Sequence, residues 1–158
     1  MSSRDGASAV DTVMPAYLVV LAGVTTALHI WKLPPALPRL QVELGLSLVQ
    51  SGFLLSLVQM AGMMLGLLMG LFAEKIGLRR CLLLGLLLLS LASAAGAVFV
   101  DKTLMLVFRA LEGCGFLMVA MPGPALIRRL VAPNQLARLL GVWGSYMPMG
   151  AVAVLLAG

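Results

Sequence analysis

Long apolar runs separated by short charged gaps dominate the pattern of the chain. No charged residue occurs from Leu44 to Ala73, and none occurs from Cys81 to Val100. A membrane-spanning helix needs about 20 mostly apolar residues to cross roughly 30 Å of hydrocarbon. Each run is much longer than the roughly ten residues of a membrane β-strand, so each is predicted to be helical. The pattern predicts five spans, at about residues 15–33, 48–73, 81–100, 103–126 and 139–158.

Composition strengthens the membrane interpretation. Hydrophobic residues make up 61% of the chain and charged residues only 11%, whereas soluble domains carry about 25% charged residues. The net charge of +5 does not indicate a nucleic-acid surface, because the cations occupy short gaps and form no continuous basic face. Anionic lipid headgroups are the expected counter-charge. The predicted fold class is an all-α membrane protein.

The charge of the gaps predicts the orientation in the membrane. The gaps after the second and fourth predicted spans hold six cations: Lys75, Arg79, Arg80, Arg128, Arg129 and Arg138. The opposite side holds fewer cations, including Lys32 at the end of the first span, and also has acids. Cytoplasmic loops carry the excess of Lys and Arg. The N-terminal tail, residues 1–14, is therefore expected in the cytoplasm and the protein in the cell inner membrane. Trp31 and Trp143 are expected at the membrane interfaces.

Known catalytic and cofactor motifs are absent from the sequence. Cys81 and Cys114 have no metal-ligand spacing around them, and the chain has one histidine. They are expected to be small residues packed between helices. The sequence contains no H-E-x-x-H, no G-x-S-x-G and no phosphate-binding Gly-Lys-Ser/Thr loop. An enzyme, a metal site, a cofactor and direct use of ATP are therefore not expected.

The second predicted span carries glycines at every fourth position, at Gly62, Gly66 and Gly70. Residues at this spacing share one helix face and allow a second helix to approach closely. The alternative is the ordinary glycine richness of membrane helices. The same span places Gln59 near the middle of the bilayer, where its amide needs a partner on another helix or in a watery cavity.

The fourth predicted span contains two charges, Arg109 and Glu112. A charge at the centre of a membrane helix costs about 2.5–3.5 kcal/mol on insertion scales. A spacing of three residues puts both on one face, where they can partly neutralise each other. Two interpretations stay open: a structural ion pair, or a polar cavity for a small solute or proton. His29 likewise is either an interhelical hydrogen-bonding residue or a ligand or proton site. Pro122 and Pro148 are expected to bend their spans.

Three motifs resemble those of the major facilitator superfamily. "GLFAEKIGLRR" resembles its loop between helices two and three, with Gly70, Glu74, Gly77, Arg79 and Arg80 at the motif positions. "RALEGCGF" resembles its fourth-helix pattern of an arginine followed by a glycine. "GVWGSYMPMG" resembles its fifth-helix pattern, through the residues Gly141, Gly144, Pro148 and Gly150. Met147 stands where the antiporter form has glycine. "HIWKLPPALP" and "SYMPMG" also resemble the cyanate and nitroimidazole transporter branch.

The resemblance implies a fold of two six-helix halves, each built of two inverted three-helix repeats. The chain would then supply five of twelve helices and need a missing C-terminal half as its partner. Helices one and four line the central cavity in that family, and transport proceeds by alternating access. The expected cavity residues are His29, Gln59, Arg109, Glu112 and Tyr146. In this scheme Arg109 attracts an anionic solute such as cyanate, and Glu112 carries a coupling proton.

Two alternatives to a working transporter half remain. The chain ends within an apolar run, "GAVAVLLAG", as expected for part of a longer protein. A truncated remnant or a non-transporting accessory membrane protein would look the same. Glu74, the acid among the six cations of the inner gaps, also has two interpretations. It is either a solvated loop charge or a breakable ion pair with Arg79, Arg80, Arg128 or Arg129, which the resemblance suggests steadies one state of the cycle.

Overall fold

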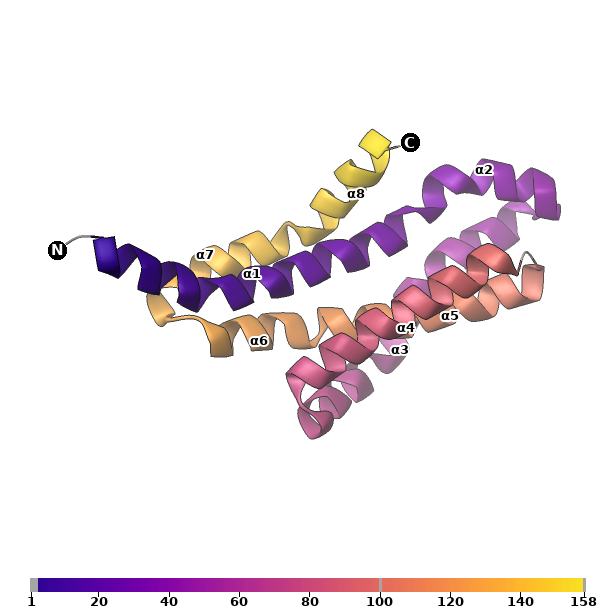
Figure 1. The fold of residues 1–158 in the computed structure, drawn as a ribbon. Coiled ribbons are helices and arrows are strands. Elements are labelled where there is room, and N and C mark those ends of the chain that lie inside the picture. Colours follow the sequence, from indigo (N-terminus) through magenta and orange to yellow (C-terminus); the bar gives the residue numbers. More distant parts are fainter. Residues whose placement is uncertain (1–2, 100, 158) are drawn as a thin grey trace.

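The computed structural model describes residues 3–99 and 101–157, apart from the side chains of residues 3–12, 44, 58, 59, 61–63, 67, 102 and 157. Within these ranges the secondary structure is helical, as predicted, and short turns connect the helices (Figure 1). The helices are α1 (Ser3–Trp31), α2 (Leu33–Leu44), α3 (Leu48–Ile76), α4 (Leu78–Val98), α5 (Lys102–Ala120), α6 (Pro122–Leu130), α7 (Pro133–Gly144) and α8 (Tyr146–Ala157).

Four stretches of the described residues are long and apolar enough to cross a membrane. They are Val13–Glu43, Leu78–Val98, Thr103–Leu130 and Pro133–Leu156. The second predicted span corresponds to α3, which has 29 residues; its described part includes the shorter apolar helix Leu48–Leu57. The protein is thus a multi-pass membrane protein, and the total of five spans stays a prediction.

The first span is longer than the sequence suggested. It was expected to run from about residue 15 to 33, but α1 begins at Ser3 and α2 continues the path to Leu44. The backbone N–H of Lys32 still donates to the Leu28 carbonyl at 3.0 Å across the junction. Two prolines occupy the first turn of α2, where their missing N–H groups leave no helical bond unmade. Lys32 therefore lies within a helical path that continues past the predicted end of the span, and which of its residues lie in the membrane stays a prediction.

Prolines mark the interruptions in the last two spans, as expected. α5 ends at Ala120, and α6 starts at Pro122. The last span begins at Pro133, six residues before the predicted start, and breaks at Ser145 between α7 and α8. Pro148 has no N–H to donate to the carbonyl of Gly144, so the helical ladder is interrupted there. The N–H of Ser145 donates instead to the Val142 carbonyl at 3.1 Å.

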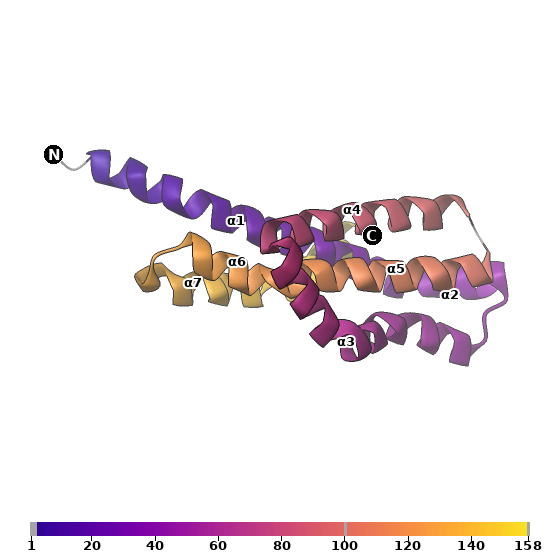
Figure 2. The ribbon, with the colours of Figure 1, turned by 90° about the horizontal axis from the view of Figure 1, so that it is seen from below.

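The helices pack in two groups, which are connected through α1–α2 and through α5–α6. Figure 1 shows α1 beside α7 and α8, with α6 on its other side, and α1 contacts all three of these helices. Figure 2 shows α5 between α3 and α4, which it contacts most extensively. The main buried cluster lies where α1, α4, α5, α6 and α7 meet. Many large apolar side chains on the outside stay exposed, as expected for a surface facing lipid.

Trp143 was expected at a membrane interface, and that expectation is wrong. Its side chain is only 7% exposed and belongs to the main buried cluster. A β-carbon added at Gly123 would lie 2.2 Å from the indole ring, so only glycine leaves room for it. The ring also packs on Tyr146, with ring centroids 4.8 Å apart. Trp31, in contrast, is 38% exposed.

Glycines allow a close contact between α4 and α5, whereas the described glycines of α3 make no such contact. A β-carbon at Gly85 would lie 2.8 Å from the Gly115 carbonyl oxygen, and one at Gly115 would lie 3.0 Å from that of Gly85. At Gly66 and Gly70 a β-carbon would meet no described atom within 4 Å. The expected packing face is thus not covered by a described part of this chain, and Gly62 has no described side-chain environment. Whether another helix covers this face stays a prediction.

Replacing Gly115 by leucine is expected to destabilise the α4–α5 contact. Overpacking of a well-packed interior typically costs about 1–3 kcal/mol. We expect a lower thermal unfolding midpoint for the full-length protein in detergent, followed by size-exclusion chromatography after heating. Gly52→Leu is the matched control, because a β-carbon at Gly52 would meet no described atom within 4 Å. Equal midpoints for both variants would contradict the assignment of this contact.

Candidate functional site

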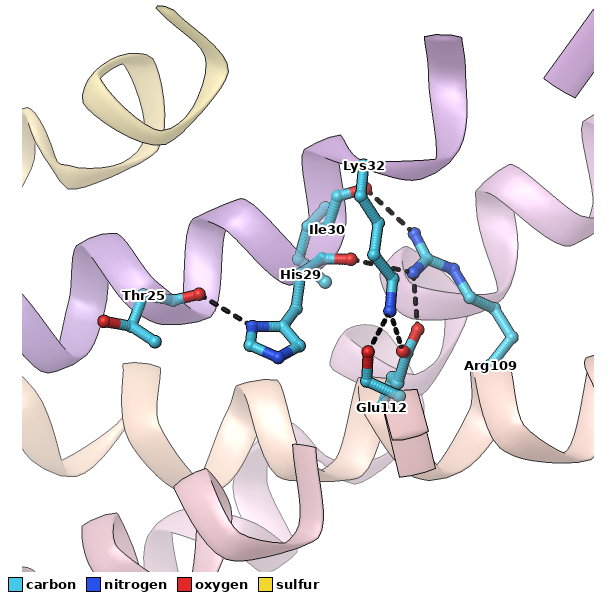
Figure 3. Close-up of polar contacts among 7 residues, drawn as sticks. Thr25, His29, Ile30, Lys32, Arg109 and Glu112 are labelled. Carbon is cyan, nitrogen blue, oxygen red and sulfur yellow. Dashed lines mark hydrogen bonds and ion pairs between the residues drawn. The ribbon is translucent and has the colours of Figure 1, made fainter. Parts of the chain in front are cut away.

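The candidate site is a cluster of three charged side chains, Lys32, Arg109 and Glu112, where the α1–α2 junction meets α5 (Figure 3). Arg109 Nη1 lies 2.7 Å from Glu112 Oε2, and Lys32 Nζ lies 2.6 Å from Glu112 Oε1. Each carboxylate oxygen therefore has its own cation. The pairing of Arg109 with Glu112 was predicted from their spacing, and the structure shows it.

Burial separates the three charges. Arg109 and Glu112 are each 4% exposed, whereas the Lys32 side chain is 41% exposed. Taking ions out of water is expensive, and a buried pair is stable only when its remaining hydrogen-bonding groups are satisfied. The Arg109–Glu112 pair is therefore the fixed part of the cluster. The Lys32 side chain is long and more exposed, so its ammonium can move away from Glu112 with a smaller structural change than the Arg109 guanidinium would need.

Backbone carbonyls of α1 hold the guanidinium in place. Arg109 Nη1 donates to the His29 carbonyl at 3.3 Å, and Nη2 donates to the Ile30 carbonyl at 3.2 Å. These carbonyls belong to the last turn of α1, just before the junction with α2. The last turn of a helix has carbonyls without helical partners and carries a partial negative charge. Arg109 therefore links the end of α1 to α5.

A second polar contact connects the cluster to α4. Lys32 Nζ donates to the hydroxyl oxygen of Ser93 as well as to Glu112. Lys32 is 61 residues from Ser93 and 80 residues from Glu112 in the chain, so its ammonium group joins the α1–α2 junction to α4 and α5. Neither Lys32 nor Ser93 was among the residues predicted for the site. The signal that could have pointed to Lys32 is its position as a cation directly after the apolar run of the first predicted span.

His29 joins the cluster only through its backbone. Its ring Nδ1 donates to the Thr25 carbonyl at 2.8 Å, one turn earlier in α1, and the ring is turned toward Thr25 in Figure 3. The expected interhelical hydrogen bond of the ring is therefore replaced by one within α1. A role of the ring as a solute or proton site stays a prediction.

The other two expected cavity residues are not in the cluster. Tyr146 is half-buried against Trp143 and faces Gly23 of α1. The side chain of Gln59 lies outside the described residues, and nearby Ser56 donates to the Phe53 carbonyl within α3. Of the five residues expected to line a cavity, the structure joins the side chains of Arg109 and Glu112 directly.

The loop motif between α3 and α4 is partly explained by the backbone. Gly77 has φ +93°, a conformation that side chains with a β-carbon rarely adopt, so the predicted glycine turn is confirmed. Glu74 is exposed and borders a groove lined by Gly66, Gly70 and Pro122. The ion pairs found among the described residues do not include one from Glu74 to Arg79, Arg80, Arg128 or Arg129. The proposed tie is thus not formed in this conformation.

The glycines of the fifth-helix motif have different surroundings. A β-carbon at Gly150 would lie 2.4 Å from the β-carbon of Ala27, so this glycine allows α8 to pack closely on α1. At Gly141 and Gly144 a β-carbon would meet no described atom within 4 Å.

Of the two cysteines, Cys81 is fully buried beside Ala73 and Met118, as expected for a packing residue, and both thiols are free.

Comparison with known proteins identifies the family. The model of the Major Facilitator Superfamily matches residues 17–158. The chain belongs to the major facilitator superfamily. This confirms the resemblance to the superfamily drawn from the three motifs. Four spans, the ion cluster and the Gly77 turn are thus features of a major facilitator chain.

A curated relative supports the same assignment. The major facilitator chain is 34% identical over 142 residues to the puromycin resistance protein pur8 of Streptomyces alboniger. The match covers 89% of this chain and 27% of that protein, so the chain spans about a quarter of its relative's length. No solved structure matches the chain. The cyanate branch gains no support from these comparisons.

Proposed function

We propose that this chain is part of a secondary active transporter that moves a small solute by alternating access, with Glu112 as its coupling carboxylate. The observation that carries the proposal is the Lys32–Glu112–Arg109 cluster. It places one acid between two cations, with Glu112 almost fully buried inside the membrane-spanning region. Intramembrane charges are expensive, and they typically mark solute or proton pathways.

The geometry suggests how coupling would work. A proton taken up by Glu112 would remove the attraction that holds Lys32, while Arg109 would keep its two carbonyl partners on α1. Lys32 lies between α1 and α2, so its release would break the bonds that tie the α1–α2 junction to Ser93 of α4 and Glu112 of α5. A small charge change would thus bias one arrangement of the helices over another.

The charge of the cluster favours an anionic solute. Two cations and one carboxylate leave one net positive charge when Glu112 is ionised. The sequence suggested Arg109 as the group that attracts an anion, but its terminal nitrogens are occupied by Glu112 and by two carbonyls. We therefore assign the first contact with the anion to Lys32, whose ammonium is the more accessible.

A second candidate is the export of a toxic compound. It is favoured by the relative from Streptomyces alboniger, which is a puromycin resistance protein. Both candidates are tested by expressing the full-length protein and comparing labelled cyanate and labelled puromycin in inverted and right-side-out membrane vesicles. Movement of either solute driven by a pH gradient supports a coupled transporter and decides between the candidates. Absence of gradient-driven movement for these and for a panel of organic anions would contradict the proposal.

The location in the inner membrane with the N-terminus in the cytoplasm is part of this proposal. It is supported by the six cations near the α3–α4 and α6–α7 turns, because cytoplasmic loops carry the excess of Lys and Arg. A second half with further helices would complete the transporter. The coding sequence beyond Gly158 would show whether this half follows in the same chain or is supplied separately.

Glu74→Gln is expected to change the transport rate more than the protein level. In our proposal Glu74 pairs with a loop arginine in another state of the cycle, so its loss would shift the balance between states. Uptake rates per transporter, measured in membrane vesicles, test this expectation. Glu43→Gln is the control, because Glu43 forms an exposed pair with Arg39 at 2.8 Å. A lower protein level with an unchanged rate per transporter would contradict this expectation and indicate that Glu74 contributes to folding only.

A further inference from the structure

We propose that the cavity between α2, α4 and α5 binds a small amphiphilic monoanion rather than a membrane lipid, with its charged group at Lys32 and Arg109 and its apolar part toward Ala97 and Phe108. This narrows the solute class of the proposed transporter and therefore rests on that function. The cavity has a volume of about 300 Å³ and includes the ion cluster in its wall. That volume lies at the lower end of the range for sites that bind small molecules.

The cavity has a polar end and an apolar end. Lys32, Ser93, Arg109 and Glu112 form the polar end. The rest of the wall is apolar or has no side chain: Leu33, Ala36, Leu40, Gly96, Ala97 and Phe108. A solute with charge at one end and hydrocarbon at the other matches this division, whereas a very small polar anion would leave the apolar wall unfilled.

An unsatisfied donor points to a ligand at the polar end. Arg109 Nε is buried, and it has no hydrogen-bond partner among the described residues. Buried polar groups almost always have a partner, so an orphaned N–H on a charged side chain requires an explanation. Nη1 and Nη2 each have at least one hydrogen-bond partner, so Nε is the guanidinium nitrogen without one among the described residues. A carboxylate or other anionic oxygen would satisfy it once a side-chain movement at the polar end opens this buried nitrogen to the cavity.

The net charge of the polar end sets the charge of the ligand. Lys32 and Arg109 outnumber Glu112 by one, so one negative charge would neutralise the cluster. Lys32 can turn toward a ligand because its side chain is 41% exposed. A monoanion would thus be held between a movable ammonium and a fixed guanidinium, and its binding would compete with Glu112 for Lys32.

Equilibrium dialysis of labelled octanoate against the full-length protein in detergent tests this proposal. Octanol and octylammonium are the matched neutral and cationic probes. We expect octanoate to bind at least tenfold more tightly than either, because a charge-assisted hydrogen bond strongly favours the anion. Equal binding of the three probes would overturn the proposal. Displacement of octanoate by phosphatidylglycerol, with no binding in its presence, would assign the cavity to a membrane lipid and also overturn it.

Two variants locate the binding. Ala97→Trp fills the apolar end and should abolish octanoate binding, whereas Ala94→Trp, on the same helix but outside the cavity wall, should not change it. Lys32→Gln should weaken octanoate binding about tenfold and leave octanol binding unchanged. Unchanged octanoate binding by the Ala97→Trp variant would show that the anion binds outside this cavity, and would overturn the proposal. Gradient-driven transport of another solute, without octanoate binding, would overturn this inference and leave the proposed function standing.

Discussion

Glu112→Ala is expected to remove most of the folded transporter from the membrane. The substitution leaves the Arg109 guanidinium only 4% exposed and without its counter-ion, and Lys32 loses its partner as well. Removing one member of a buried ion pair typically costs about 3–5 kcal/mol, because the remaining charge is uncompensated. The amount of full-length protein in the membrane and its thermal unfolding midpoint in detergent measure this loss.

A double substitution separates stability from function. Arg109→Leu combined with Glu112→Leu removes both buried charges, and such replacements by apolar residues are often neutral or stabilising. We expect the protein level of the double variant to return close to the original, while transport stays lost. If the cluster were only a structural ion pair, the double variant would recover both the protein level and transport. Full transport by the double variant would therefore contradict a functional role of the cluster.

Lys32→Met is expected to reduce transport at least tenfold with little change in protein level. Methionine keeps an unbranched apolar stem but removes the ammonium that contacts Glu112 and Ser93. Glu112 keeps its bond to Arg109 at 2.7 Å, so the buried carboxylate still has a cation. A tenfold loss corresponds to about 1.4 kcal/mol of the transport barrier. Initial uptake rates per transporter in membrane vesicles give the measurement.

Arg39→Met provides the control for Lys32→Met. Arg39 also pairs with a glutamate, but its side chain is 84% exposed, and the pair lies within one helix. Exposed ion pairs contribute little to stability, so this substitution should leave both level and transport unchanged. If both substitutions reduced transport equally, a general effect of positive charge on α2 would replace the specific role of Lys32.

The helical secondary structure of the apolar runs was predictable from the sequence, but the residues at which the helices begin and end were not. Apolar runs of span length permit only helices in lipid, because each backbone group must be satisfied within the segment. The path of the first span past Lys32 was missed because a cation followed by prolines resembles a span end. Prolines in the first turn of α2 allow the helix to continue instead.

The site shows a similar division between local and long-range information. Arg109 and Glu112 are three residues apart, so helix geometry alone predicted their contact. Lys32 and Ser93 reach the same place from 61 residues apart, which depends on how α1, α2 and α4 pack. Trp143 was misplaced for the same reason: its pocket at Gly123 is formed by another helix.

The glycine pattern on α3 predicted a close helix contact that the described residues do not show. A spacing of four predicted close packing, yet Gly66 and Gly70 meet no described atom that a β-carbon would touch. The contacts at Gly85 and Gly115 carried no comparable repeat and were not predicted. Spacing identifies a face with small residues, but only the tertiary arrangement decides which helix, if any, occupies it.

Comparing solute exchange with net transport in Glu112→Gln proteoliposomes is the most direct test of the central claim. Exchange of labelled for unlabelled solute requires binding and alternating access but no net proton movement, whereas transport driven by a pH gradient requires the coupling carboxylate. The identified solute and the full-length protein are used for both assays. The account predicts that Glu112→Gln retains exchange and loses gradient-driven transport. Gradient-driven transport at the original rate would contradict it.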